Sequence, residues 1–267
     1  MLKRCMEIWD EVRQGSPLVH CITNYVTVND VANIILAAGA SPAMAEHPEE
    51  AGDFAQLAQG LYLNLGTLTS EQEQAMIAAA KGARDVGIPL LVDPVACGVI
   101  KRKQEVLAQL ISQGRVSVIK GNGAEIKSLA GMSANARGVD SLDSGAGLDE
   151  ACRNLSQEYQ AVIAATGEVD VVADGPRLAH IHNGTHLFGR ITGAGCMVGG
   201  VMSACLAVAP AEIWLAGITG LLAFNIAGER TIAVCGNNPG TFRFMLADQL
   251  YHLRGHDVLE EGKVAWR

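Results

Sequence analysis

Short apolar runs alternate with amphipathic stretches along most of the chain. Five runs are apolar at successive positions, which is typical of strands in a parallel sheet covered on both faces. These predicted strands cover residues 18–22, 60–65, 88–92, 116–119 and 161–165. The stretches with helical periodicity cover residues 28–38, 70–86, 101–113, 147–159 and 241–254. The alternation predicts a three-layer α/β/α fold, with helices on both faces of a mainly parallel sheet.

Turn and cap residues refine these elements. Two later apolar runs, 169–173 and 178–182, flank the sequence Asp-Gly-Pro-Arg and predict an antiparallel hairpin that joins the sheet. Asn29 is the predicted cap of the helix at 28–38. The pattern Ser70-x-x-Glu73 predicts a capping box where the helix at 70–86 begins.

The least charged part of the chain is residues 198–227, where Glu212 is the only charged residue. Pro210 and Glu212 divide it into pieces shorter than the ~20 residues that a membrane-spanning helix needs. Two buried helices and no membrane association are therefore expected. The most linker-like segment, 131–147, is too short to separate two domains, so residues 1–267 are expected to form a single domain.

Charge and cysteine content narrow the class of protein further. The net charge is −8, and no block of Lys and Arg stands out, which argues against nucleic-acid binding. The seven cysteines are odd in number and contain no C-x-x-C pair, as expected for reduced thiols. No secretory signal is evident at the N-terminus, so a cytoplasmic protein is expected.

Small and polar residues follow four of the predicted parallel strands directly. Open parallel sheets bind ligands beyond the carboxyl ends of their strands, so a site is expected at this edge. The residues concerned are Asn64, Gly66, Asp93, Lys120, Asn122, Thr166 and Gly167.

The sequence ITGAGCMVGG places a glycine loop at the start of an apolar helix. Free backbone N–H groups around Gly193 and Gly195 would face an anion there, although a tight turn into a packed helix is the alternative. The loop matches neither G-x-G-x-x-G nor the Walker A pattern. Cys196, in the first helical turn, could act as an acyl-transfer nucleophile, as a base beside a hydroxyl, or as a structural thiol.

Two carboxylates on neighbouring loops suggest a cation. Asp93 follows a buried strand, while Asn122 is a predicted N-cap with Glu125 at the N3 position of the next helix. Two such groups can hold Mg²⁺, whereas each alone would be read as a turn or cap residue. Their proximity to Lys120 and the glycine loop favours Mg²⁺ with phosphate.

Two other chemical features are weaker. The histidines at 180, 182 and 186 have no cysteine or carboxylate at ligand spacing nearby, so a zinc site is disfavoured. By spacing alone, Met44 is a core residue.

Six segments together resemble the hydroxyethylthiazole kinase family of the ribokinase-like superfamily. They are HCITNYVTVNDVAN, LAAGASPAMAE, VDPVACG, IKGNGAEI, ATGEVDVVADG and TGAGCMVGG, and the resemblance extends from about residue 15 to residue 250. It implies a ribokinase-like fold and an ATP- and Mg²⁺-dependent enzyme. Such an enzyme phosphorylates the hydroxyl of 4-methyl-5-(2-hydroxyethyl)thiazole, a salvage step toward thiamine. The family also implies a homotrimer with active sites at the subunit interfaces.

The resemblance assigns roles to individual residues. Those implied to contact the thiazole are Met44, Gly193, Asn24 and Gly66. Those implied to bind ATP are Lys120, Thr166, Asn122 and Gly195. Asp93 and Glu125 are implied to lie near Mg²⁺, and Cys196 stands where most ribokinase-like kinases carry an aspartate base. Many relatives have Arg at the position of Lys120. The lysine keeps the positive charge but lacks the planar guanidinium group that donates two parallel hydrogen bonds.

Three other functions remain alternatives at this stage. Another ribokinase-like kinase, such as a hydroxymethylpyrimidine kinase, would share the fold but not the ITN and SPAMAE segments. A thiol hydrolase would pair Cys196 with His180 or His182 and would need no ATP. A non-catalytic ATP or thiazole sensor would bind without turnover, but it would not need the carboxylates of Asp93 and Glu125.

Overall fold

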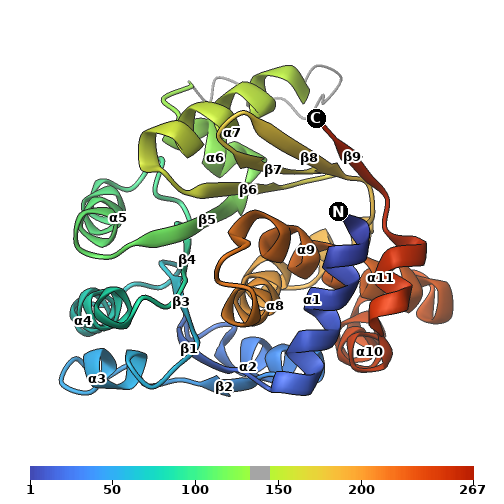
Figure 1. Cartoon of the computed structure of the whole chain (residues 1–267), viewed down its shortest axis with the longest axis horizontal. Coiled ribbons are helices and arrows are strands. Elements are labelled where there is room, and N and C mark those ends of the chain that lie inside the picture. The colour runs from blue at the N-terminus through green and yellow to red at the C-terminus, as the bar shows by residue number, and fades with distance from the viewer. Residues whose placement is uncertain (133–144) are drawn as a thin grey trace.

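The computed structural model describes residues 1–132 and 145–267, in which nine strands form one sheet (Figure 1). The order across the sheet is β2-β1-β3-β4-β5-β6-β7-β8-β9. The first six strands in this order form five parallel pairs, and the three pairs that add β7, β8 and β9 are antiparallel. The strands are β1 Leu18–Ile22, β2 Ser41–Ala43, β3 Gly60–Asn64, β4 Leu90–Asp93, β5 Val116–Asn122, β6 Val162–Thr166, β7 Asp170–Asp174, β8 Arg177–Ile181 and β9 Val264–Trp266. The predicted mainly parallel sheet and its hairpin are confirmed.

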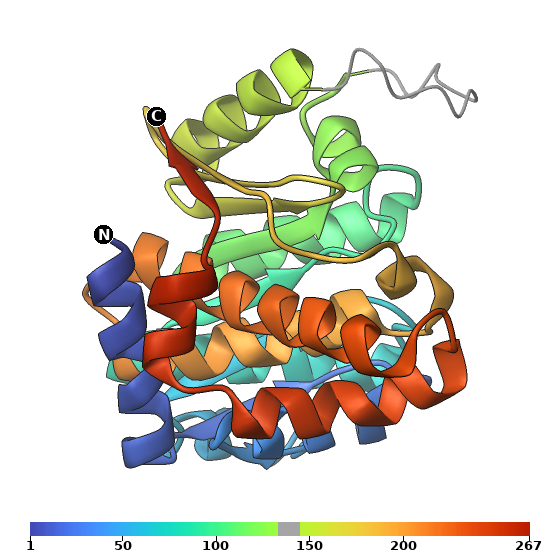
Figure 2. The ribbon, with the colours of Figure 1, turned by 90° about the vertical axis from the view of Figure 1, so that its right-hand side faces the viewer.

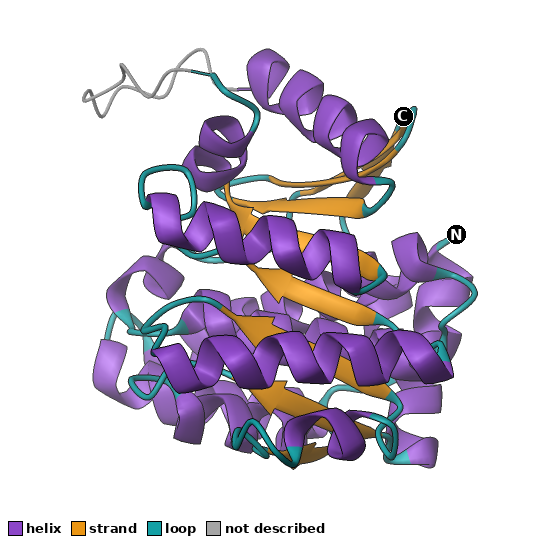
Figure 3. Ribbon diagram, turned by 90° about the vertical axis from the view of Figure 1, so that its left-hand side faces the viewer, coloured by secondary structure: helices purple, strands orange, loops and turns teal. Residues whose placement is uncertain are grey.

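Helices cover both faces of the sheet, which gives three layers. Figure 3 shows the helices of one face, which are α3 Ala51–Ala55, α4 Ser70–Val86, α5 Lys101–Gln113, α6 Gly123–Leu129 and α7 Gly145–Tyr159. Figure 2 faces the other side, whose helices are α1 Leu2–Gly15, α2 Val28–Ala38, α8 Ala194–Val208, α9 Ile213–Cys235, α10 Pro239–His252 and α11 Gly255–Glu261. A 3₁₀ helix, η1 His186–Arg190, precedes α8.

Alternating side chains along the strands feed two apolar cores. On β3, Leu61 and Leu63 pack into the core beneath α3 to α7, whereas Tyr62 faces the core beneath α8 and α9. This arrangement explains why the parallel strands are apolar at successive positions: both of their faces are buried.

Helices α8 and α9 are the innermost helices of their layer. Gly199 allows α8 to approach the sheet, because a Cβ there would lie 2.6 Å from the hydroxyl oxygen of Tyr62. Among the described residues, α9 is the one helix long and apolar enough to cross a membrane, and 67% of its most apolar window is buried inside the protein. It is therefore a core helix, and the two buried helices predicted on either side of Pro210 are confirmed.

The predicted caps of α2 and α4 are wrong by two residues and by one residue, respectively. Helix α2 has Thr27 as its N-cap, and Asn29 instead lies in the first turn, where its side-chain oxygen accepts from Asn33. The capping box of α4 is formed by Thr69 and Gln72. The sequence holds two overlapping Ser/Thr-x-x-Glu/Gln patterns, so spacing alone could not choose between them. Most of the predicted linker-like segment 131–147 lies outside the described residues.

Candidate functional site

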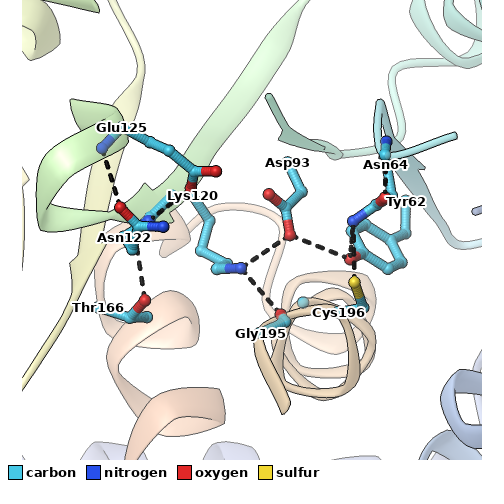
Figure 4. A network of polar contacts seen from close by, with 12 residues as sticks. Tyr62, Asn64, Asp93, Lys120, Asn122, Glu125, Thr166, Gly195 and Cys196 are labelled. Atoms are coloured by element: carbon cyan, nitrogen blue, oxygen red, sulfur yellow. Dashed lines mark hydrogen bonds and ion pairs between the residues drawn. The ribbon is translucent and has the colours of Figure 1, made fainter. Parts of the chain in front are cut away.

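The carboxyl ends of the parallel strands meet at one edge, as the sequence predicted. Asn64 of β3 is in register with Asp93 of β4, and Asn122 of β5 is in register with Thr166 of β6. Lys120 lies two residues before Asn122 on β5, so the two side chains lie on the same face of the sheet. The N-terminus of α8 lies against this edge, as Figure 4 shows.

A buried ion pair forms the centre of this edge. The Lys120 Nζ atom lies 2.7 Å from Asp93 Oδ2 and also donates to the Gly195 carbonyl at 2.8 Å (Figure 4). Both side chains are only 3% exposed. Burial raises the pKa of the Asp93 carboxyl, an effect that Lys120 opposes. Burial alone would lower the pKa of Lys120, but the charge of Asp93 raises it above its ordinary value.

The glycine loop requires glycine at its first position. Gly193 is the N-cap of α8 with φ +83°, and a Cβ there would lie 2.4 Å from Thr27 Cγ2. The first N–H groups of the helix have no partner within it, so they are available to an anion. Cys196 follows in the first turn, as predicted. The loop thus combines free amide groups, a positive helix end and a thiol.

Two asparagine amides surround the sulfur of Cys196. Asn24 Nδ2 donates to Sγ at 3.3 Å and Asn64 Nδ2 donates at 3.4 Å. Cys196 is half-buried, whereas five of the other six cysteines are buried. No histidine among the described residues contacts this sulfur. His180 instead pairs with Asp149 at 2.8 Å, which removes the support for a thiol hydrolase.

Glu125 joins two loops of the site. The predicted cap is confirmed, since Asn122 Oδ1 accepts from the Glu125 amide and Glu125 Oε2 accepts from the Asn122 amide, both at 2.9 Å. Glu125 Oε1 also accepts from the amide of Ala96, in the loop after β4. Thr166 closes the group with a hydrogen bond from its hydroxyl to the Gly121 carbonyl.

The donor set suits a cation that arrives with phosphate. In the described ranges, no cluster of three or more His, Cys, Asp or Glu side chains could hold a metal ion by itself. Asp93 and Glu125 are nevertheless close enough for the charge of Glu125 to raise the pKa of Asp93. Lys120 and Tyr62 both contact Oδ2 of Asp93, so Oδ1 is engaged by neither. Mg²⁺ commonly takes one or two carboxylates and completes its shell with phosphate and water.

A cavity of about 790 Å³ opens beside the glycine loop. Its polar wall includes Asn122, Thr166, Gly167 and Gly195. The lining also includes apolar side chains, among them Val198, Phe188, Leu221 and Phe224. A polar end beside an apolar slot is the usual form of a small-molecule site, and it fits a ligand with a charged group and a flat ring.

The residues predicted to contact a second ligand lie on the other side of Cys196. Gly66 donates its amide to Asn64 Oδ1 at 3.0 Å, and a Cβ there would lie 2.9 Å from both Asn24 Cβ and Asn64 Oδ1. The structure therefore brings Asn24, Gly66 and Cys196 together. Met44 is farther along the sheet: it follows edge strand β2, is half-buried and packs against the core.

Sequence reasoning missed two buried polar residues at this edge. Tyr62 donates to Asp93 at 3.4 Å and accepts from Asn64 at 3.1 Å. Asp170 lines the cavity and accepts from the Gly167 amide and from Asn225. Burial raises the pKa of Asp170 to about 6. Each is a polar residue inside an otherwise apolar run, which was the available signal.

Comparison with known proteins gives consistent results. The model of the hydroxyethylthiazole kinase family matches residues 9–256. A hydroxyethylthiazole kinase of Syntrophomonas wolfei is 61% identical over 266 residues, covering 100% of both chains. A solved structure of a hydroxyethylthiazole kinase protein from Pyrococcus horikoshii has a TM-score of 0.89 at 36% identity and covers 99% of both chains. A ribokinase-like superfamily protein from Enterococcus faecalis shares the fold alone, with a TM-score of 0.61 at 11% identity, over 92% of this chain and 89% of that one.

Proposed function

Because the chain belongs to the hydroxyethylthiazole kinase family, we propose that it transfers the γ-phosphoryl group of ATP to the hydroxyl of 4-methyl-5-(2-hydroxyethyl)thiazole. The product is the phosphate ester used in thiamine salvage. The observation that carries this assignment is the buried Lys120–Asp93 pair beside the glycine loop, with Cys196 on the same helical turn. This arrangement unites a phosphate-binding cation, an anion-binding helix end and a proton acceptor.

ATP is best accommodated with its phosphates at the glycine loop and its base in the 790 Å³ cavity. The amide groups from Gly193 to Cys196 and the ammonium of Lys120 would stabilise charge on the transferring phosphoryl group. Thr166 and Asn122 line the cavity together with Gly195 of the loop. Phosphoryl transfer depends mainly on position and electrostatics, and this cluster supplies both.

Asp93 and Glu125 are the residues that would hold Mg²⁺, directly or through water. When bound, the ion supplies positive charge to the β- and γ-phosphates. Asp93 also keeps Lys120 in place, and Glu125 fixes the loop at Ala96 against β5 through two backbone amides.

The acceptor alcohol is placed on the opposite side of Cys196 from the nucleotide. Asn24, Gly66, Gly193 and Met44 would line the thiazole pocket. As the hydroxyl oxygen forms its bond to the γ-phosphorus, the bond to the β-phosphate oxygen breaks and ADP leaves. The sulfur of Cys196 takes the hydroxyl proton as general base.

The assembly proposed for this enzyme is a cytoplasmic homotrimer of single kinase domains, residues 1–267. Tyr25 and Val26 are 75% and 51% exposed directly after Asn24, which supports a subunit interface that contributes to the thiazole pocket. Seven free cysteines support a reducing compartment. Light scattering coupled to gel filtration measures the subunit number, and a monomer that retains full activity would contradict the interface site.

The substrate assignment is tested by ADP release from the purified protein with ATP, Mg²⁺ and a panel of alcohols. We expect turnover with hydroxyethylthiazole, none with hydroxymethylpyrimidine or pyridoxal, and loss of turnover with EDTA. Turnover confined to hydroxymethylpyrimidine would assign the related kinase instead. Thiazole binding without turnover on any alcohol would favour a sensor.

A further inference from the structure

The amide group of Asn64 is held in one orientation by four hydrogen bonds. Its oxygen accepts from Asn24 Nδ2 at 2.9 Å and from the Gly66 amide at 3.0 Å. Its nitrogen donates to the Tyr62 hydroxyl at 3.1 Å and to Cys196 Sγ at 3.4 Å (Figure 4). Both acceptor positions of the oxygen and both hydrogens of the nitrogen are thus used. The opposite orientation would set an oxygen against the sulfur and a nitrogen against two donors.

This fixed orientation determines where a proton on Cys196 can point. The sulfur receives one N–H from Asn64 and one from Asn24, so neither asparagine nitrogen can accept an S–H. A proton held by Cys196 must therefore point toward the open side of the site. The two donors also stabilise negative charge on the sulfur.

The Tyr62 hydroxyl holds the Asn64 amide in its orientation. Its oxygen takes one N–H of Asn64, so its own hydrogen points to Asp93 Oδ2. Its ring lies against Gly199, three residues after Cys196 on α8, where a Cβ would come within 2.6 Å of the ring. The tyrosine is fully buried. The position of α8 and the orientation of the Asn64 amide are therefore fixed by one side chain.

We propose that Asn64, oriented by Tyr62, is a positioning residue that keeps the sulfur of Cys196 as a hydrogen-bond acceptor and leaves a free lone pair of that sulfur facing the bound substrate hydroxyl, whose proton it takes. The inference rests on the proposed kinase function, in which Cys196 accepts the proton of the alcohol. Asn64 touches neither phosphate nor the reacting oxygen in this account. It acts on the proton transfer through Cys196, while its oxygen also holds Asn24 and the Gly66 amide.

A substitution at Asn64 can test its effect on Cys196 without changing the charged groups nearby. The titratable neighbours on the strands that face α8 are Tyr62 on β3, Asp93 on β4 and Lys120 on β5. The Asn64→Leu substitution keeps all three and changes no charge. It removes one of the two amide donors on the sulfur and leaves the Lys120–Asp93 pair in place.

The test is the rate at which iodoacetamide alkylates Cys196 at pH 7, followed by mass spectrometry of the peptide that carries it. Losing one donor should lower this rate about fivefold in Asn64→Leu, because the attacking sulfur keeps only one of the two N–H groups that stabilise its negative charge. Cys235 is the other cysteine that is not buried, and it serves as an internal control in the same sample. Its rate should not change. An unchanged Cys196 rate with a reduced kcat would overturn the inference.

Tyr62→Phe provides a second variant that keeps the ring packed against Gly199. It removes only the hydroxyl, so we expect slower alkylation of Cys196 by about twofold and a fall in kcat with little change in the KM for ATP. Alkylation at the wild-type rate in this folded variant would also contradict the inference. Alkylation needs no turnover, so this test does not depend on the substrate assignment. Kinase activity together with an unchanged alkylation rate would contradict only the role proposed for Asn64.

Discussion

The substitution Lys120→Met should lower the free energy of unfolding, and it should also abolish phosphoryl transfer. The substitution keeps an unbranched side chain that is one heavy atom shorter and removes the charge. Asp93 Oδ2 then loses its partner at 2.7 Å and keeps only the long contact from Tyr62 at 3.4 Å. The Gly195 carbonyl also loses a donor, at the entrance to the helix that carries Cys196.

The magnitude follows from burial. Both side chains are 3% exposed, so solvent barely screens the carboxylate left behind. Breaking a buried pair by removing one partner typically costs about 3–5 kcal/mol. Asp93→Asn should cost a similar amount, since it leaves Lys120 unpaired. The double variant Lys120→Met with Asp93→Asn leaves no buried charge, and its loss should be at least about 2 kcal/mol smaller than the sum of the two single losses.

Urea unfolding followed by tryptophan fluorescence measures all four free energies of unfolding. A double variant whose loss equals the sum of the single losses would refute the reasoning, because it would show that the two charges do not interact. The kinetic result should differ from the thermodynamic one. Turnover should stay absent in the double variant even where stability returns, because the phosphate-binding cation is still missing.

Three further outcomes are expected. Burial raises the pKa of Asp170 from 3.8 to about 6, so the stability contributed by its protonated form is lost as pH rises through about 6; urea titrations at pH 4.5 and 7.5 should show Asp170→Asn removing a pH-dependent loss of about 2 kcal/mol, and an unchanged pH dependence would contradict this. Gly193→Ala should lower kcat more than tenfold and stability by about 1–2 kcal/mol, because of its φ of +83° and its clash with Thr27, while Gly175→Ala, at φ +56° but with no neighbour within 4 Å, should lower stability by about 1 kcal/mol and leave kcat unchanged. Cys196→Asp should retain turnover in the ADP assay, and its complete loss with the fold intact would contradict the base assignment.

Much of the fold could be predicted from the sequence because its strands are buried on both faces. The bounds of β1, α2, α4 and α5 match the predicted ranges, since apolar runs and flanking glycines mark them. The elements that were missed are mainly those with mixed or short patterns. They are α1, β2, α3, η1, α11 and β9. Edge strand β2 has three residues and includes a proline, so no alternation is visible.

The sequence was sufficient to predict which residues lie at the strand ends that form the site, but not the hydrogen bonds and ion pair between them. Asp93, Lys120, Asn122 and Thr166 were placed by one rule, the convergence of parallel strands at their carboxyl edge. That Asp93 pairs with Lys120 could not be deduced, because the pairing depends on the register between β4 and β5, which shifts between Leu90 and Leu91. Tyr62 was missed for the same reason.

The most direct test of the central claim is chromatography and mass spectrometry of a reaction containing the protein, ATP, Mg²⁺ and hydroxyethylthiazole. We expect the phosphate ester of the thiazole in amounts equal to the ADP formed, with none from Lys120→Met. ADP formed without that ester would show ATP hydrolysis uncoupled from the alcohol, and it would contradict the assignment of this site as a thiazole kinase centre.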